Sequence, residues 1–192
     1  MATTATPYGL RPVRRLDGMP YAGAVTHYNI TSGNSTAIFY GDLVANDANG
    51  EITKETSTNS GRPVGVFVGC SYTDPNVNTK VWKQYYPAST QADDIVAYVV
   101  DDPNVVFEIQ ADDAVAQTGM NANFAVVQTA GDTTIGNSKV TLDASTAGTT
   151  NSLPVRLVGF STRPESAVGD AFTDCLVVIN HGVHAHTDSQ GI

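Results

Sequence analysis

Apolar and polar residues alternate in short segments along most of the chain. An alternation with a period of two is that of a β-strand, whose successive side chains point to opposite faces. Segments of this kind predict strands at 24–30, 37–45, 64–72, 80–85, 95–100, 105–110, 125–128, 139–142, 155–160 and 175–180. Many short strands separated by polar breaks predict a mainly β fold, either a β-sandwich or a β-barrel-like domain.

The breaks between these segments are rich in Gly, Asn, Asp and Ser. Such side chains hydrogen-bond to their own backbone or tolerate positive φ, so 46–50, 56–61, 101–104 and 143–151 are predicted turns or loops. The segment 111–118 has Asp residues in its first turn and a glycine directly after it, which predicts the one short helix.

The first 20 residues differ from the rest of the chain. They hold three of its ten basic residues, Arg11, Arg14 and Arg15, against the single acidic residue Asp17. The segment has too little apolar surface to offset the entropy of ordering it alone, which predicts an extended N-terminal arm that needs a partner. The sequence therefore predicts an arm over residues 1–20 and a single β-rich domain over residues 21–192. An arm folded back on its own acidic domain is the alternative.

The net charge of −9 disfavours binding to nucleic acid or to anionic membranes, which need clustered Lys and Arg. No apolar run approaches the ~20 residues of a membrane helix, and no charged-then-apolar leader opens the sequence, so we expect a soluble protein that is not secreted. A length of 192 residues suits one domain with a sizeable core.

Candidate chemistry is sparse. His184 and His186 would share one face of a strand and could bind a transition metal, but no further ligands stand at a suitable spacing, so we predict no metal site and a plain surface or interface strand there. The adjacent pairs 93–94, 101–102 and 112–113 are aspartates without the spacing of a calcium loop. Phosphate-binding and nucleophile motifs are absent, so we predict neither an enzyme nor a cofactor.

Two further features are open to more than one interpretation. Cys70 and Cys175 lie in apolar segments and are expected to be buried, reduced thiols, although a disulfide is possible. Tyr72, Trp82 and the segment 85–87 form an aromatic group that belongs either to the core or to the apolar centre of a subunit interface.

Several uncommon strings occur along nearly the whole chain: MATTATPYGLRPV (1–13), GCSYTDP (69–75), QYYPAST (84–90), YVVDDPN (98–104), GNSKV (136–140) and LPVRLVGF (153–160). In these strings and their order the chain resembles a family of small head proteins of tailed bacteriophages.

This resemblance implies a capsid decoration, or cement, protein, made in the host cytoplasm and found in the virion on the outer capsid surface. It implies a β-rich subunit with a β-tulip-type domain, commonly a homotrimer, that stabilises the shell formed by the major capsid protein. On this basis we expect the arm to bind the capsid or a neighbouring subunit through Tyr8, Arg11, Arg14 and Arg15, because a guanidinium group can bind a carboxylate through two hydrogen bonds.

Two other classes of function stay open. A receptor- or carbohydrate-binding module of the virion surface would stack exposed Tyr side chains or Trp82 on sugar rings, and would occur in few copies per particle. A metal-dependent enzyme would use the terminal histidines, which metal analysis and the substitutions His184→Ala and His186→Ala would test.

Overall fold

The computed structural model describes residues 4–184, and its fold is mainly β, with 37% of these residues in strands or β-bridges and 3% in helical turns. This confirms the fold class expected from the alternation. Thirteen strands and two short 3₁₀ turns follow one another along the chain: β1 (Arg11–Arg15), β2 (Thr26–Asn29), β3 (Leu43–Asn46), β4 (Ile52–Lys54), β5 (Gly65–Asp74), β6 (Thr79–Lys83), β7 (Val96–Val100), β8 (Val105–Gln110), η1 (Gln117–Gly119), β9 (Asn123–Phe124), β10 (Val126–Val127), β11 (Thr141–Leu142), η2 (Ala144–Thr146), β12 (Val155–Phe160) and β13 (Asp174–Ile179). Within the described part of the chain, no helix has the length and hydropathy of a membrane span.

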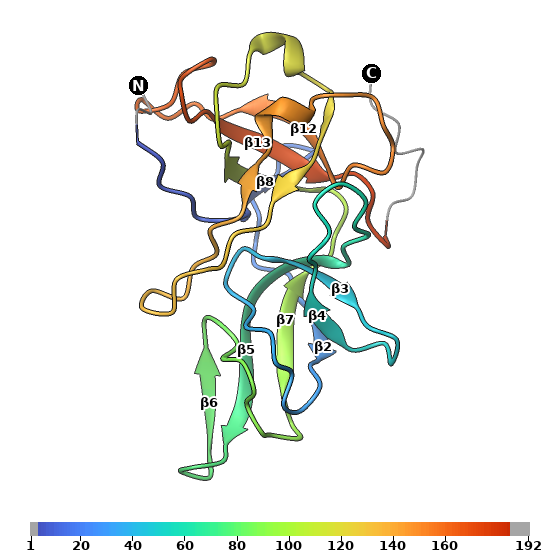
Figure 1. Ribbon diagram of the computed structural model, residues 1–192, viewed down its shortest axis with the longest axis vertical. Helices are drawn as coiled ribbons and strands as arrows, with labels where there is room; N and C mark the ends of the chain where they lie inside the picture. The colour runs from blue at the N-terminus through green and yellow to red at the C-terminus, as the bar shows by residue number, and fades with distance from the viewer. Residues whose placement is uncertain (1–3, 185–192) are drawn as a thin grey trace.

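The strands form two larger antiparallel sheets and a short pair, β10–β11. The five-stranded sheet has the order β1-β8-β13-β12-β9, and its labelled strands lie in the upper part of Figure 1. The six-stranded sheet has the order β2-β7-β5-β3-β4, with β6 paired to the distal half of β5. The β5–β6 hairpin therefore forms the lower end of the molecule, away from the five-stranded sheet (Figure 1).

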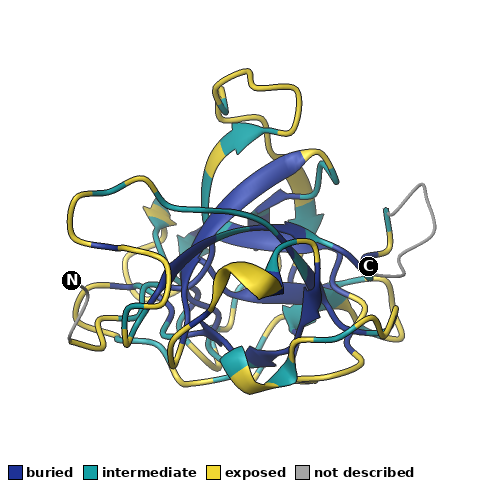
Figure 2. Ribbon diagram, turned by 90° about the horizontal axis from the view of Figure 1, so that it is seen from above, coloured by how far each residue is buried: buried dark blue, intermediate teal, exposed yellow. Residues whose placement is uncertain are grey.

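The six-stranded sheet is buried on both faces near its centre. Consecutive residues of one strand contribute to two different clusters: Val66 and Val100 pack into a core shared with the five-stranded sheet, whereas Phe67 and Val99 pack into a second core on the other face. The shared core holds the two sheets together as one unit, and Figure 2 shows buried strands at the centre of the molecule with exposed loops around them. This layered arrangement is compatible with a β-sandwich-like domain.

Nearly all of the predicted strands are present, with small shifts at their ends. The segment 37–45 is the exception, because it forms single bridges at Ile38 and Tyr40 and only then β3. Gly41 interrupts it with φ +91°. The strands β1, β4 and β9 were not predicted.

The helix predicted over 111–118 is wrong, because only the 3₁₀ turn η1 forms at its end. Its backbone donors are used by other segments: the N–H of Ala111 bonds to the carbonyl of Thr173, that of Asp112 to Leu142, and that of Val115 to the Thr173 hydroxyl. A segment held on both sides by neighbouring strands cannot close its own helical hydrogen bonds.

Cys70 and Cys175 are buried and free, which confirms the expectation of buried, reduced thiols and not the alternative of a disulfide. Burial raises the pKa of the Cys70 thiol and that of the Cys175 thiol to about 12, so neither forms a thiolate at neutral pH.

Asp42 and Lys54 form a buried ion pair next to Gly41. The Asp42 carboxylate is fully buried; its Oδ2 lies 3.1 Å from Nζ of Lys54 and accepts a hydrogen bond from the N–H of Phe39. Its Oδ1 accepts a hydrogen bond of 2.5 Å from the Ser138 hydroxyl. Every oxygen of this carboxylate is therefore paired inside the protein.

Candidate functional site: an arginine-lined groove

The N-terminal segment lies on the chain's own domain. Leu10 is fully buried in the shared core, and its N–H donates to the carbonyl of Gly41. The two chain segments cross closely: Gly9 has φ +73°, and a Cβ atom at this position would lie 2.7 Å from the carbonyl oxygen of Gly41. Residues 8–15 therefore fold back on the chain's own domain. This is the alternative to an arm that extends to a partner.

A β-bulge determines which arginines share a face. In β1, Arg11 pairs with Glu108 and Arg14 with Val106, and the register shifts between Pro12 and Arg14. In a regular strand, two residues three positions apart point to opposite faces. Here Val13 is an extra, bulged residue, so the side chains of Arg11 and Arg14 point to the same face. Arg11 and Arg14 therefore both lie on the outer face of the five-stranded sheet, beside β8.

The carboxylate of Glu108 is the centre of this face. It is almost fully buried, with a relative exposure of 3%, and forms ion pairs with Arg11 and with Arg163, the latter at 3.1 Å. Its other oxygen accepts a hydrogen bond of 2.7 Å from the Ser161 hydroxyl. Two guanidinium groups thus share one buried carboxylate, and the Asp174 carboxyl lies close enough to interact electrostatically with Glu108 and Arg11.

Arg14 lies beside this network but does not take part in its ion pairs. Within residues 4–184 no carboxylate pairs with it, and its Nη1 donates only a long bond of 3.3 Å to the carbonyl of Arg15. It lies on the rim of a groove of about 500 Å³. The groove is lined by two arginines, one carboxylate and a set of mainly apolar and small polar residues: Val13, Arg14, Glu108, Gly159, Phe160, Ser161, Thr162, Arg163 and Leu176.

The other residues of the predicted arm site lie apart from this groove. Arg15 forms ion pairs with Asp102 at 2.8 Å and with Asp17 at 3.3 Å. Tyr8 donates a hydrogen bond of 2.9 Å to Asp174, and the guanidinium group of Arg11 lies 5.0 Å from the centre of its ring. Burial and the neighbouring Asp174 raise the pKa of Tyr8, so it remains a hydrogen-bond donor at neutral pH.

Of the predicted set, only Arg14 lines the groove. Arg11 adjoins it through its ion pair with Glu108, while Arg15 and Tyr8 serve to hold the N-terminal segment in place. Glu108 and Arg163 were not singled out in the sequence. The carboxylate within the apolar strand segment VVFEIQ is the one signal that could have found this cluster, since a buried carboxylate needs a charged partner.

Asp174 makes the attachment of the N-terminal segment sensitive to pH. Burial raises the pKa of the Asp174 carboxyl above its ordinary value of 3.8. A carboxyl whose pKa is raised by folding stabilises the native state below its unfolded pKa, and this contribution is lost as the pH rises through the folded pKa.

We therefore expect Asp174→Asn, which keeps an acceptor for Tyr8 but cannot ionise, to be more stable relative to the wild type at about pH 7 than at about pH 4. Urea unfolding at the two pH values measures this difference, with the exposed Asp93→Asn as the control. An Asp174→Asn effect that is the same at both pH values would contradict the assignment.

The histidine and aspartate candidates have structural contacts. Nε2 of His184 lies 3.8 Å from the carboxylate of Asp101, which also accepts hydrogen bonds from Tyr28 and Thr26. His186 lies outside the described residues. Across residues 4–184, no group of three or more His, Cys, Asp or Glu side chains is arranged to hold a metal ion.

The aromatic group is divided between the core and the surface. Tyr72 and Tyr86 are buried in the second core, whereas Trp82 on β6 is 60% exposed. Its ring packs over the backbone of Gly69, where a Cβ atom would lie 2.8 Å from Cζ2 of Trp82. The ring is therefore held against the sheet with much of its surface open to solvent.

Comparisons of the chain with protein-family models, with curated proteins and with solved structures find no match.

Proposed function

We propose that this chain is a capsid decoration protein that binds the outer surface of a tailed-phage head and stabilises the shell of its major capsid protein. The observation that carries the proposal is the groove beside β1, in which Arg14 has no carboxylate partner among the described residues and Val13, Phe160 and Leu176 supply apolar surface. The resemblance of the sequence to phage head proteins supports it. An acidic segment of the capsid protein would pair with Arg14 and pack on the apolar floor.

A protein of this kind acts through the free energy of its own binding. Because it binds only the assembled shell, its bound state stabilises that shell by mass action. Assembly as a homotrimer would multiply each weak contact, since three grooves would then bind together.

The structure changes how the N-terminal segment would act. β1 is already paired with β8, so the proposed contact uses a preformed groove and not an arm that becomes ordered on binding. A preformed site loses less conformational entropy on association. Removing residues 2–15 would also delete Leu10 from the core, so single substitutions in the groove test the proposal more cleanly.

Binding of the purified protein to expanded phage heads that lack it tests the proposal. We expect saturable binding with a copy number on the order of hundreds per head, measured by co-sedimentation and quantitative gel analysis, as the symmetry of a shell requires. A copy number of only a few per particle would favour a spike or fibre component instead.

A second candidate function is a receptor- or carbohydrate-binding module of the virion surface. The exposed ring of Trp82 favours it, because a flat aromatic surface held against a sheet can stack on the apolar face of a sugar.

A further inference from the structure

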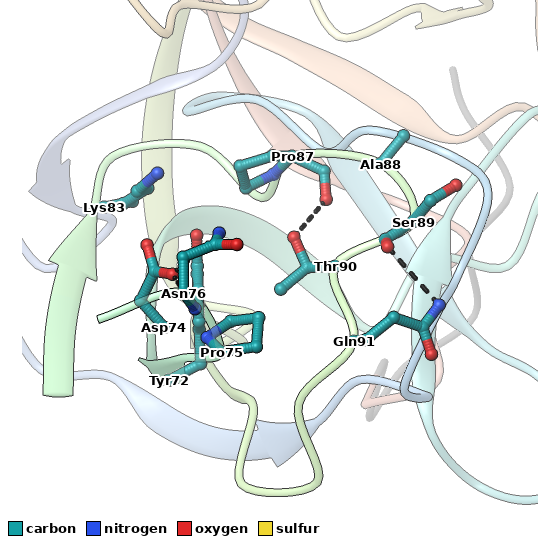
Figure 3. Close-up of a pocket in the computed structure, with 10 residues that line it drawn as sticks. All are labelled: Tyr72, Asp74, Pro75, Asn76, Lys83, Pro87, Ala88, Ser89, Thr90 and Gln91. Carbon is teal, nitrogen blue, oxygen red and sulfur yellow. Dashed lines mark hydrogen bonds between the residues drawn. The ribbon is translucent and has the colours of Figure 1, made fainter. Parts of the chain in front are cut away.

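A polar cleft of about 310 Å³ lies beside the β5–β6 hairpin, which in Figure 1 is at the end of the molecule away from the five-stranded sheet. One wall comes from the β5–β6 hairpin and the other from the loop 87–91 (Figure 3). Its lining combines one cation, one carboxylate, several hydroxyl and amide groups and two proline rings: Tyr72, Asp74, Pro75, Asn76, Lys83, Pro87, Ala88, Ser89, Thr90 and Gln91. A volume of this size is at the lower end of the range for small-molecule sites.

Hydrogen bonds to Gly33 and Asn34 hold the loop 87–91 in place. The N–H of Ser89 donates to the carbonyl of Asn34 at 2.7 Å, and that of Gly33 donates to the carbonyl of Thr90 at 2.8 Å. Ser89 has φ +61°, a left-handed conformation that is unfavourable for a non-glycine residue. The hydrogen bonds that hold Ser89 in this conformation shape the loop before any ligand arrives, so binding would require little reordering.

The hairpin wall is ordered by its own turn. Oδ1 of Asp74 accepts hydrogen bonds from the backbone N–H and the side-chain amide of Asn76, at 2.9 and 3.1 Å. The ammonium group of Lys83 lies 5.8 Å from the ring centre of Tyr72, and within residues 4–184 it forms no ion pair with a carboxylate. A hydrogen bond to Tyr72 raises the pKa of Lys83, so it is charged at neutral pH.

The charges of the cleft balance, since one ammonium group faces one carboxylate. The remaining polar groups, on Asn76, Thr90 and Gln91, are neutral donors and acceptors. Two proline rings add apolar wall surface. A ligand that matches this lining has no net charge, many hydroxyl groups and an apolar C–H face.

We propose that this cleft binds a small neutral saccharide, with Lys83 and Asp74 hydrogen-bonding to its hydroxyl groups and the rings of Pro75 and Pro87 against its C–H surface. The inference goes beyond the second candidate function, which uses Trp82, because it places a saccharide on the opposite face of β6. It does not depend on shell binding, because the arginine-lined groove is formed by residues of β1, β8, β12, β13 and the segment 161–163, whereas the cleft lies between the β5–β6 hairpin and the loop 87–91.

Titration of the ¹⁵N-labelled protein with the methyl glycosides of glucose, galactose and N-acetylglucosamine tests the proposal by NMR. We expect at least one of them to shift the amide signals of 72–76 and 87–91, at concentrations up to about 20 mM, which suffice for a Kd near 1 mM. Lys83→Gln should weaken this binding about tenfold or more, because it removes a charge-assisted hydrogen bond. Gln91→Ala, on the other wall, should weaken it as well.

Lys80→Gln is the matched control, because Lys80 is on the same strand but pairs with Asp94 outside the cleft, and it should leave binding unchanged. Three results would overturn the proposal: no shift with any glycoside, shifts confined to residues around Trp82, or shifts at the cleft with inorganic phosphate only. Shell binding by Lys83→Gln is expected to equal that of the wild type, so a failure of this inference is distinct from a failure of the capsid proposal.

Discussion

Lys54→Met is expected to lower the free energy of unfolding by about 3–5 kcal/mol, which is the usual cost of leaving a buried charge without its partner. The Asp42 carboxylate that Lys54 contacts is fully buried, and the Lys54 side chain is itself only 9% exposed. The variant would have to keep this carboxylate in the interior with only neutral hydrogen-bond donors. Urea denaturation followed by fluorescence or circular dichroism measures the change.

Lys139→Met provides the control for this prediction. Its ammonium group lies 3.5 Å from Asp132, but both side chains are partly exposed, at 42% and 33%, so the expected change is below about 1 kcal/mol. If the two variants lost similar amounts of stability, the buried ion pair would not have the role that we assign to it.

Arg14→Glu is expected to weaken binding to expanded heads by about tenfold to a hundredfold, because a charge-assisted hydrogen bond contributes about 1.5–3 kcal/mol. The fold should be unaffected, since Arg14 forms no ion pair with a carboxylate in residues 4–184. Arg14→Lys, which keeps the charge but not the planar fork, should retain part of the affinity. Co-sedimentation with heads over a range of protein concentrations gives the apparent Kd.

Arg62→Glu is the charge-matched control, because Arg62 is exposed and does not line the groove. If Arg14→Glu and Arg62→Glu bound expanded heads with the same apparent Kd, the groove would not be the capsid contact. Net charge alone would then account for any common loss of affinity.

The β-strands could be predicted because alternation is a local property of the sequence. Segments such as 64–72 and 105–110 carry the pattern in full, and they form the central strands β5 and β8. β1 carries no such pattern: Pro12 and three arginines conceal a strand that is held by Leu10 in the core and by pairing with β8. The helix expected over 111–118 failed for a related reason, because distant segments take its backbone hydrogen bonds.

The arginine-lined groove could be predicted only in part. The excess of arginine near the N-terminus is visible in the sequence, but the β-bulge at Val13 decides that Arg11 and Arg14 share a face while Arg15 turns to Asp102. Arg163, in the loop between β12 and β13, meets Glu108 because β13 pairs with β8 in the sheet. No local pattern encodes a contact between residues so far apart in the chain.

Electron cryomicroscopy of expanded heads saturated with the protein tests the central proposal most directly. The account predicts density on the outer surface at repeated, symmetry-related positions, with the β1 face against the major capsid protein and the β5–β6 hairpin directed outward. Absence from the shell, binding at a single vertex or tail only, or attachment through the hairpin end would contradict it.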